Sequence, residues 1–337
     1  MAEGQWAGTH QHIDPSDMDN TAQESQVRES SAGTSIPAGP DESRQPDSHH
    51  GLRAIGDFLS LTKPRIVVLI LLTTWVGFLM GSAMSPAGSL LADVLIGVGL
   101  LCAGSAALNQ VIERDRDALM ARTRNRAIAA KRVSATAGTI FGLVLSVAGT
   151  VWLFVFVNWL TAVVGIVTSI TYLVIYTPMK LTTTWSIFFG AIAGSLPPVM
   201  GWTAAQDSLG WGAAALFGIM MVWQVPHSFA IALLYGEDYA HADFAVAQLA
   251  KRDAHSLARL IQLYSTLMLL LAAGPWLLRL NTHLYLIGAA ALGGLFIVVG
   301  MPFGLGEPRS YARRVFRASL LYLPLLFIWM ALTRSGG

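Results

Sequence analysis

Long apolar stretches alternate with short polar connections from about residue 66 to residue 333. Each stretch is close to the ~20 residues that an α-helix needs to cross ~30 Å of hydrocarbon. Several connections are only a few residues long, which makes neighbouring helices antiparallel. The pattern predicts an all-α, multi-spanning membrane bundle. The nine predicted spans are 66–84, 91–112, 134–155, 159–176, 185–204, 212–234, 259–279, 284–303 and 317–333.

The N-terminal segment has a different character. Residues 1–52 are rich in Ser, Asp, Gln, Pro and Gly and have almost no aliphatic run. Such a segment cannot bury enough apolar surface to offset its ordering entropy, so we expect a disordered polar tail followed by a transmembrane domain over 53–337. It lacks a basic start followed by an apolar core, so we do not expect a signal peptide.

Composition supports a membrane environment. The 337 residues are 54% hydrophobic and 12% charged, whereas a soluble domain carries about 25% charged residues. The net charge of +2 argues against a nucleic-acid partner. The one cysteine, Cys102, has no partner for an intrachain disulfide and is interpreted as a small buried residue.

Basic residues indicate the orientation of the bundle. The connections after the even-numbered spans are basic, and the opposite side carries only Arg279 and Arg334. The positive-inside rule then places the N-terminus and the longer loops in the cytoplasm, with an odd number of spans in a cell inner membrane. The loop after the second span holds Arg114, Arg116, Arg122, Arg124, Arg126, Lys131 and Arg132.

An oxygen-rich segment ends the second span. Asn109, Glu113 and Asp117 are spaced four residues apart, so on a helix they stack on one face. Oxygen ligands of this kind suit Mg²⁺, and the guanidinium groups of Arg122 and Arg126 beside them suit a diphosphate. A solvated positive-inside loop with i,i+4 ion pairs is the alternative, although it does not explain Asn109 at the membrane border.

A further acidic segment follows the sixth span. Glu237 and Asp238 are adjacent, and we expect His227 and Asp238 to share one helical stripe. Two acidic clusters from separate helices can bind Mg²⁺ between them and hold a diphosphate. His227 is either a substrate ligand or a polar residue hydrogen-bonded inside the bundle.

Three further basic residues lie on the same membrane side as the acidic clusters. Lys63 and Arg65 precede the first span, and Lys180 ends the fourth. Each alone can be a snorkelling anchor. Their placement together favours contacts with phosphate.

At these residues the sequence resembles the UbiA-type intramembrane prenyltransferases, over roughly residues 56–333. Within that family, the glutamate of the first acidic motif and the Pro-His pair ahead of Asp238 resemble the branch that farnesylates protohaem IX. The motifs, in order, are Thr62-Lys-Pro-Arg65, Asn109-x3-Glu113-x3-Asp117, Met120-x-Arg122-Thr123-x-x-Arg126, Tyr176-Thr177 with Lys180, Gly194-x-x-Pro197-Pro198-x-x-Gly201-Trp202, and Pro226-His227 leading to Asp238-Tyr239.

The resemblance implies a nine-helix bundle with a central cavity, Mg²⁺ as cofactor, and farnesyl diphosphate and haem B as substrates. It implies that an allylic cation is captured by a haem vinyl group, with water completing the product, haem O. A haem A synthase or an oxidase-assembly protein is an expected partner. The metal-binding and catalytic residues would be Asn109, Glu113, Asp117, Glu237 and Asp238. The residues that bind diphosphate or substrate would be Lys63, Arg65, Arg122, Arg126, Lys180, His227 and Tyr239.

The loops depart from the family pattern. Ala127 stands where the family usually has proline, and Asp243-Phe-Ala-Val-Ala247 replaces a usual Gly-x-Pro-Met-Leu. An acceptor other than haem, such as a quinone precursor or another lipid-soluble ring, therefore remains open. A transporter or a non-catalytic haem-handling protein is a third hypothesis, but the sequence shows no convincing inverted repeat.

Overall fold

The computed structural model describes residues 48–82, 88–250, 254–302 and 307–335. Most of the predicted tail, 1–52, falls outside them, and its last residues belong to the first helix, which begins at Ser48. The helices are α1 (Ser48–Leu61), α2 (Pro64–Gly81), α3 (Gly88–Ile112), α4 (Arg114–Asp117), α5 (Ala135–Phe156), α6 (Trp159–Ile170), a π-helix (Thr171–Tyr176), α7 (Thr177–Thr182), α8 (Ser186–Gln206), α9 (Trp211–Leu234), α10 (Gly236–His241), α11 (Ala247–Ala250), α12 (Ala254–Leu271), α13 (Gly274–Leu277), α14 (His283–Gly300) and α15 (Pro308–Leu332).

The prediction of nine spans is confirmed for the described part of the chain, where nine helical segments are long and apolar enough to cross a membrane. The last predicted span, 317–333, was placed too late, because α15 begins at Pro308. Hydropathy marks only the apolar part of this helix. Arginine is a good helix former, so the basic residues from Arg309 to Arg317 continue the helix beyond the hydrocarbon.

Helix α8 is the interior helix of the bundle. It packs against α2, α6 and α9, and 67% of its most apolar 18-residue stretch is buried. It stays helical through Pro197 and Pro198, and a membrane helix tolerates such residues where neighbouring helices surround it. The approach to α2 is very close, since a Cβ atom at Gly77 would overlap the Pro198 carbonyl and one at Gly201 would overlap that of Thr74.

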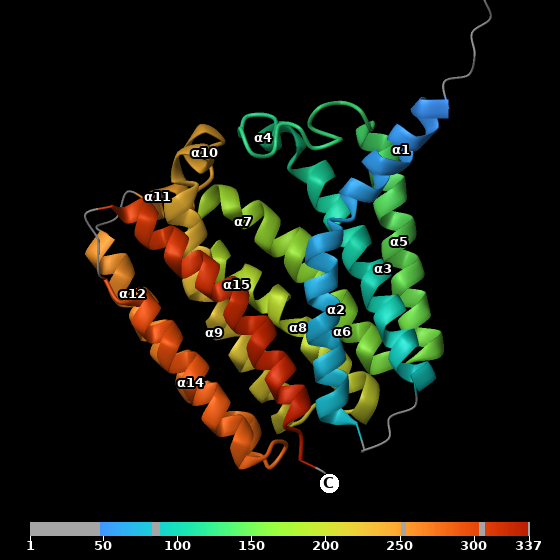
Figure 1. Cartoon of the computed structure of the whole chain (residues 1–337). Coiled ribbons are helices and arrows are strands. Elements are labelled where there is room, and N and C mark those ends of the chain that lie inside the picture. The colour runs from blue at the N-terminus through green and yellow to red at the C-terminus, as the bar shows by residue number, and fades with distance from the viewer. Residues whose placement is uncertain (1–47, 83–87, 251–253, 303–306, 336–337) are drawn as a thin grey trace, which may run out of the picture. The chain divides into compact units, whose positions relative to one another are not determined.

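The outer helices present apolar side chains outward. In α5 only 17% of the corresponding 18-residue stretch is buried, and Val144, Val151 and Phe154 are among its exposed side chains. In water such a surface would aggregate, but against lipid it costs nothing. The short helices α1, α4 and α10 all lie at one end of the bundle, opposite the end where α15 finishes (Figure 1). That end carries both acidic segments.

Candidate active site

Asn109, Glu113 and Asp117 stack as predicted, although the helix is not continuous. Helix α3 ends at Ile112 and α4 begins at Arg114, yet the Glu113 amide donates to the Asn109 carbonyl (3.0 Å) and the Asp117 amide to the Glu113 carbonyl (2.8 Å). The helical spacing therefore survives the junction. The three residues are 1%, 7% and 1% exposed. Carboxylates buried this deeply are costly unless they are paired.

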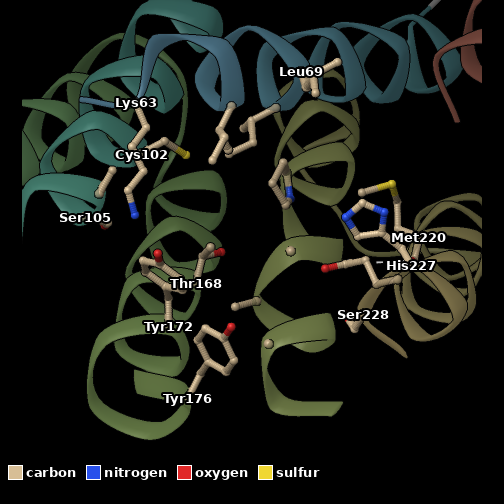
Figure 2. Close-up of a pocket in the computed structure, with 18 of the residues that line it drawn as sticks. Lys63, Leu69, Cys102, Ser105, Thr168, Tyr172, Tyr176, Met220, His227 and Ser228 are labelled. Atoms are coloured by element: carbon tan, nitrogen blue, oxygen red, sulfur yellow. Dashed lines mark hydrogen bonds between the residues drawn. The ribbon is translucent and has the colours of Figure 1, made fainter. Parts of the chain in front are cut away.

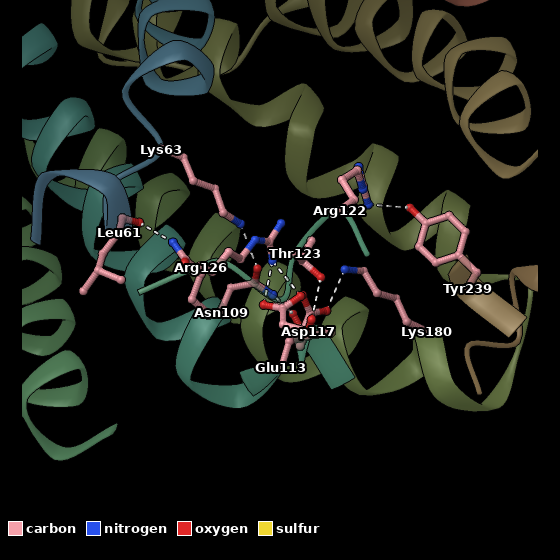
Figure 3. Close-up of polar contacts among 12 residues, drawn as sticks. Leu61, Lys63, Asn109, Glu113, Asp117, Arg122, Thr123, Arg126, Lys180 and Tyr239 are labelled. Atoms are coloured by element: carbon pink, nitrogen blue, oxygen red, sulfur yellow. Dashed lines mark hydrogen bonds and ion pairs between the residues drawn. The ribbon is translucent and has the colours of Figure 1, made fainter. Parts of the chain in front are cut away.

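Three cations from separate segments pair with these oxygens (Figure 3). The Lys63 Nζ atom donates to Asn109 Oδ1 (3.0 Å), and the Lys180 Nζ atom donates to Glu113 Oε1 (2.6 Å). One terminal nitrogen of Arg126 donates to both carboxylate oxygens of Asp117 (2.8 and 2.7 Å). We call these six residues, Lys63, Asn109, Glu113, Asp117, Arg126 and Lys180, the ion cluster.

The ion cluster contains more cationic than anionic side chains. Burial lowers the pKa of the Lys63 ammonium to about 7, and the nearby Arg126 contributes to that shift. Burial also raises the pKa of the Asp117 carboxyl, while Arg126 opposes that shift. Lys63 has a left-handed backbone (φ 51°, ψ 58°), which is uncommon for a non-glycine residue and is a feature of functional sites. An anionic ligand beside Lys63 would oppose both causes of the lowered pKa and would stabilise its charged form.

Two buried threonines complete the cluster, and the sequence argument did not assign them a role. Thr177 accepts a hydrogen bond from Asn109 Nδ2 (3.2 Å), and the Thr123 hydroxyl donates to the Asp117 carbonyl (2.9 Å). Thr177 begins α7 directly after the π-helix, a local widening that often occurs at functional sites. The signal was available in the motifs, since Thr177 lies three residues before Lys180 and Thr123 next to Arg122.

An apolar cavity of about 600 Å³ adjoins the cluster (Figure 2), a volume within the usual range of small-molecule sites. Lys63 and Lys180 belong both to its lining and to the ion cluster. Lys180 also lies over the Tyr176 ring, with its Nζ atom 4.6 Å from the centroid. The predicted central cavity is therefore present. Its lining from mid-span positions includes Leu101, Met200, Met220 and Leu323.

His227 lines this cavity and is held on three sides. Its Nδ1 atom lies 2.8 Å from the Ser319 hydroxyl. Its ring stacks against Trp223 and Phe316, with centroids 4.9 and 5.2 Å away. Pro226 before it does not interrupt α9. The hydrogen bond and the position in the cavity wall are compatible with both interpretations of His227, so its role stays a prediction.

The second acidic segment is arranged differently from the prediction. Helix α9 ends at Leu234 and α10 starts at Gly236, so the helix predicted to carry His227 and Asp238 on one stripe is interrupted at Tyr235 (φ −119°, ψ 22°). The Tyr235 and Tyr239 amides still donate to the Ile231 and Tyr235 carbonyls, both at 3.0 Å, so the shared stripe stays a prediction. Asp238 is half-buried. The Glu237 side chain is 79% exposed and pairs with Arg309 at 2.6 Å.

The loops that follow α3 and α9 nevertheless meet. One terminal nitrogen of Arg116 donates to Asp243 Oδ2 and to the Ala242 carbonyl, both at 2.9 Å. Arg122 lies 4.7 Å from the centroid of the Tyr235 ring and donates a long hydrogen bond (3.5 Å) to the Tyr239 hydroxyl. Arg122 and Tyr239 thus bridge the two segments. Within the described ranges, no three His, Cys, Asp or Glu side chains group as a metal site.

Arg65 is not brought into the site. It is exposed, and among the described residues no hydrogen bond or ion pair joins it to the ion cluster.

The oxygens of Asn109, Glu113 and Asp117 fit Mg²⁺ by their chemistry, since all are hard donors. The cations in the cluster occupy one oxygen of Glu113 and both oxygens of Asp117.

Comparison with known proteins identifies the family of this chain. Residues 70–333 match the model of the UbiA prenyltransferase family. The chain is 40% identical over 289 residues to the protoheme IX farnesyltransferase of Koribacter versatilis, covering 83% of this chain and 93% of that protein. It is 35% identical over 276 residues to the protoheme IX farnesyltransferase of Legionella pneumophila, covering 81% and 93%.

Solved structures share the fold. A digeranylgeranylglyceryl phosphate synthase structure superposes with a TM-score of 0.68 at 15% identity, covering 83% of this chain and 98% of that one. A UbiA homolog from Archaeoglobus fulgidus bound to GPP and Mg²⁺ gives 0.61 at 16% identity, covering 81% and 99%. From the matched residues and the identity to its relatives, the chain belongs to the UbiA prenyltransferase family.

Proposed function

We propose that this protein transfers a farnesyl group from farnesyl diphosphate to a vinyl group of protohaem IX, giving haem O. The names of relatives at 40% and 35% identity support the acceptor and the donor, and the family supports prenyl transfer. We place the enzyme in the cell's inner membrane, with the ion cluster on the cytoplasmic side, on the basis of the charge asymmetry of the loops.

The observation that carries the proposal is the junction between the ion cluster and the apolar cavity. A prenyl diphosphate is an anion joined to a hydrocarbon chain, and Lys63 and Lys180 stand where these two environments meet. The ammonium groups can bind the diphosphate while the chain lies among apolar side chains.

The chemistry follows from this arrangement. The C–O bond of farnesyl diphosphate breaks with its electron pair leaving on the diphosphate. Lys63, Lys180 and Arg126 stabilise the developing charge, which lowers the barrier directly. The allylic carbon then bonds to the terminal vinyl carbon of haem. Hydroxide from water joins the other vinyl carbon, and a proton is released. The Tyr172 and Tyr176 rings line the cavity and can stabilise the allylic cation through their π-faces.

Asn109, Glu113 and Asp117, with Asp238 from the second segment, would hold Mg²⁺, which neutralises charge on the diphosphate when bound. Glu237 was also predicted as a ligand, but it is exposed and pairs with Arg309. The carboxylates of Glu113 and Asp117 are paired with Lys180 and Arg126 in this structure. Those cations can release them once a diphosphate offers another anion. Substrate and metal binding are then expected to support each other.

The test uses nanodiscs that contain the protein, haem B, farnesyl diphosphate and Mg²⁺. We expect a farnesylated haem by mass spectrometry, lost in Asp117→Ala and retained in Asp115→Ala. Asp115 is a matched control because its side chain is 84% exposed. Transfer to an aromatic acid in place of haem would overturn the proposed acceptor. Absence of any transfer by the wild-type protein would overturn the proposed activity.

A further inference from the structure

A second cavity, of about 420 Å³, lies at the start of α15 beside the end of α9. Three of its lining residues are arginines, and none of them belongs to the ion cluster. Its lining residues are Leu234, Tyr235, Arg309, Arg313, Phe316 and Arg317. We call it the arginine pocket.

The arginine pocket and the main cavity share one face of α15. Arg309, Arg313 and Arg317 are spaced four residues apart, so they stack along the first turns of the helix. Phe316 lines both cavities, and Leu320 and Leu323 continue along the wall of the main cavity. One face of a single helix therefore passes from cationic to apolar. A ligand that follows it must be anionic at one edge and apolar at the other.

The charges of the arginine pocket are only partly compensated. Arg309 pairs with Glu237 at 2.6 Å. For Arg313 and Arg317, no ion pair is found with any residue that the structure describes. Arg314 contrasts with its neighbours because it donates to the Val299 and Met301 carbonyls and so caps the end of α14. The positive-inside rule explains arginines at this membrane face, but it does not require a hollow lined by three of them.

We propose that Arg313 and Arg317, with Arg309, bind the carboxylate side chains of the tetrapyrrole acceptor, an inference that rests on the proposed function. Protohaem IX carries its two propionates at one edge and its vinyl groups toward the opposite edge. Guanidinium groups bind carboxylates through paired hydrogen bonds. With the propionates in the arginine pocket, the apolar edge passes Phe316 and His227 into the main cavity, where the farnesyl donor binds.

Farnesyl diphosphate does not compete for this role. Its anionic end is accounted for by Lys63, Lys180 and Arg126, which come from other segments of the chain. Two separate cationic sites, on two cavities that share Phe316 in their walls, match two substrates that each have an anionic end. The orientation also matters for chemistry, since the vinyl edge then enters the main cavity, where it can reach the allylic carbon beside Lys63 and Lys180.

The test compares haem B with its dimethyl ester, in which both propionates are neutral. Binding of each to the full-length protein in nanodiscs is followed by the Soret absorbance, without farnesyl diphosphate. We expect Arg313→Ala and Arg317→Ala each to weaken haem B binding about tenfold and to leave binding of the ester unchanged. Arg259→Ala is the matched control, because it removes an exposed arginine from α12 and lines neither cavity. It should bind both acceptors as wild type does.

Equal binding of haem B by the wild type and both arginine variants would overturn the inference. So would an equal loss for haem B and the ester, because the arginines would then act on the fold. Repeating the titrations in nanodiscs without anionic lipids tests whether the arginines bind lipid head groups and not the haem carboxylates. An effect that vanishes there would assign the arginines to lipid head groups and overturn the inference. If haem B binds as expected but no farnesylated haem forms, the proposed function fails and the carboxylate site stands.

Discussion

The two acidic segments at one end of the bundle use the same residue types in opposite surroundings. Glu113 and Asp117 are 7% and 1% exposed and are each paired with a cation, Glu113 with the distant Lys180 and Asp117 with Arg126 of the same loop. Glu237 is mostly exposed and pairs with an equally accessible arginine. Removing the partner of a buried carboxylate destabilises the folded protein, because the remaining charge is neither paired nor solvated. An exposed carboxylate is solvated by water, so losing its partner costs little. The comparison indicates that the structure of the first segment depends on its buried ion pairs. The second segment lies next to these pairs and does not depend on a buried charge.

The largest expected effect is the loss of Asp117. Asp117→Asn keeps the size of the side chain but removes the charge that faces Arg126, and we expect turnover to fall by at least about a hundredfold. Asp115 lies two residues away and its side chain is 84% exposed. The turnover of Asp115→Asn should therefore stay within about twofold of the wild-type value. Farnesylated haem formed per minute is the measurement, with size-exclusion profiles as the control for folding. Full turnover in Asp117→Asn would remove Asp117 from the site.

The next effect concerns stability. Glu113 and Lys180 form a 2.6 Å pair with side chains 8% and 18% exposed. A double-mutant cycle with Glu113→Gln and Lys180→Met should give a coupling of about 1–3 kcal/mol. The same cycle on Arg114 and Asp115, whose side chains are 47% and 84% exposed, should give less than about 1 kcal/mol.

Unfolding free energies in mixed micelles titrated with SDS supply both coupling values. Equal coupling energies for the two pairs would mean that burial does not strengthen the ion pairs of the first segment. The contrast between the acidic segments would then rest on position alone.

Much of this contrast could be predicted from the sequence, because it depends on local spacing. The hydrogen bonds between residues four apart continue across the break at Glu113, so Asn109, Glu113 and Asp117 lie together as predicted. Hydropathy located the spans because lipid contact demands a continuous apolar stretch. The start of α15 was misplaced because arginines can extend a helix beyond the hydrocarbon without any apolar signal.

The partners of these residues could not be predicted in the same way. Lys63 and Asn109 are 46 positions apart, and Lys180 and Glu113 are 67 apart. Only the packing of α2, α3 and α7 brings them together. Thr177 was passed over because a threonine at a helix start has many ordinary explanations. The helix break at Tyr235 did have a local signal, since Gly236 follows it directly and glycine commonly ends helices.

A smaller effect should separate the two acids of the second segment. Asp238 is half-buried beside Tyr239, whereas Glu237 is exposed and held by Arg309. We expect Asp238→Asn to raise the Mg²⁺ concentration needed for half-maximal turnover about tenfold, in the range found for groups that support a metal site. Glu237→Gln should change it less than about threefold. The reverse order would show that the ion pair with Arg309 breaks when substrate binds, and that Glu237 moves inward.

The smallest effect is expected at Arg65, and it marks the boundary of the site. Lys63 reaches Asn109 at 3.0 Å from a left-handed backbone, and Lys63→Gln should raise KM for farnesyl diphosphate about tenfold, since it removes a charge-assisted hydrogen bond. Arg65 is exposed, so water already screens its charge, and Arg65→Gln should change KM by less than about twofold. Equal shifts in KM would mean that the diphosphate also contacts the outer surface of α2. In that case burial could no longer decide which cations belong to the site, and the family assignment of Arg65 would outweigh its position.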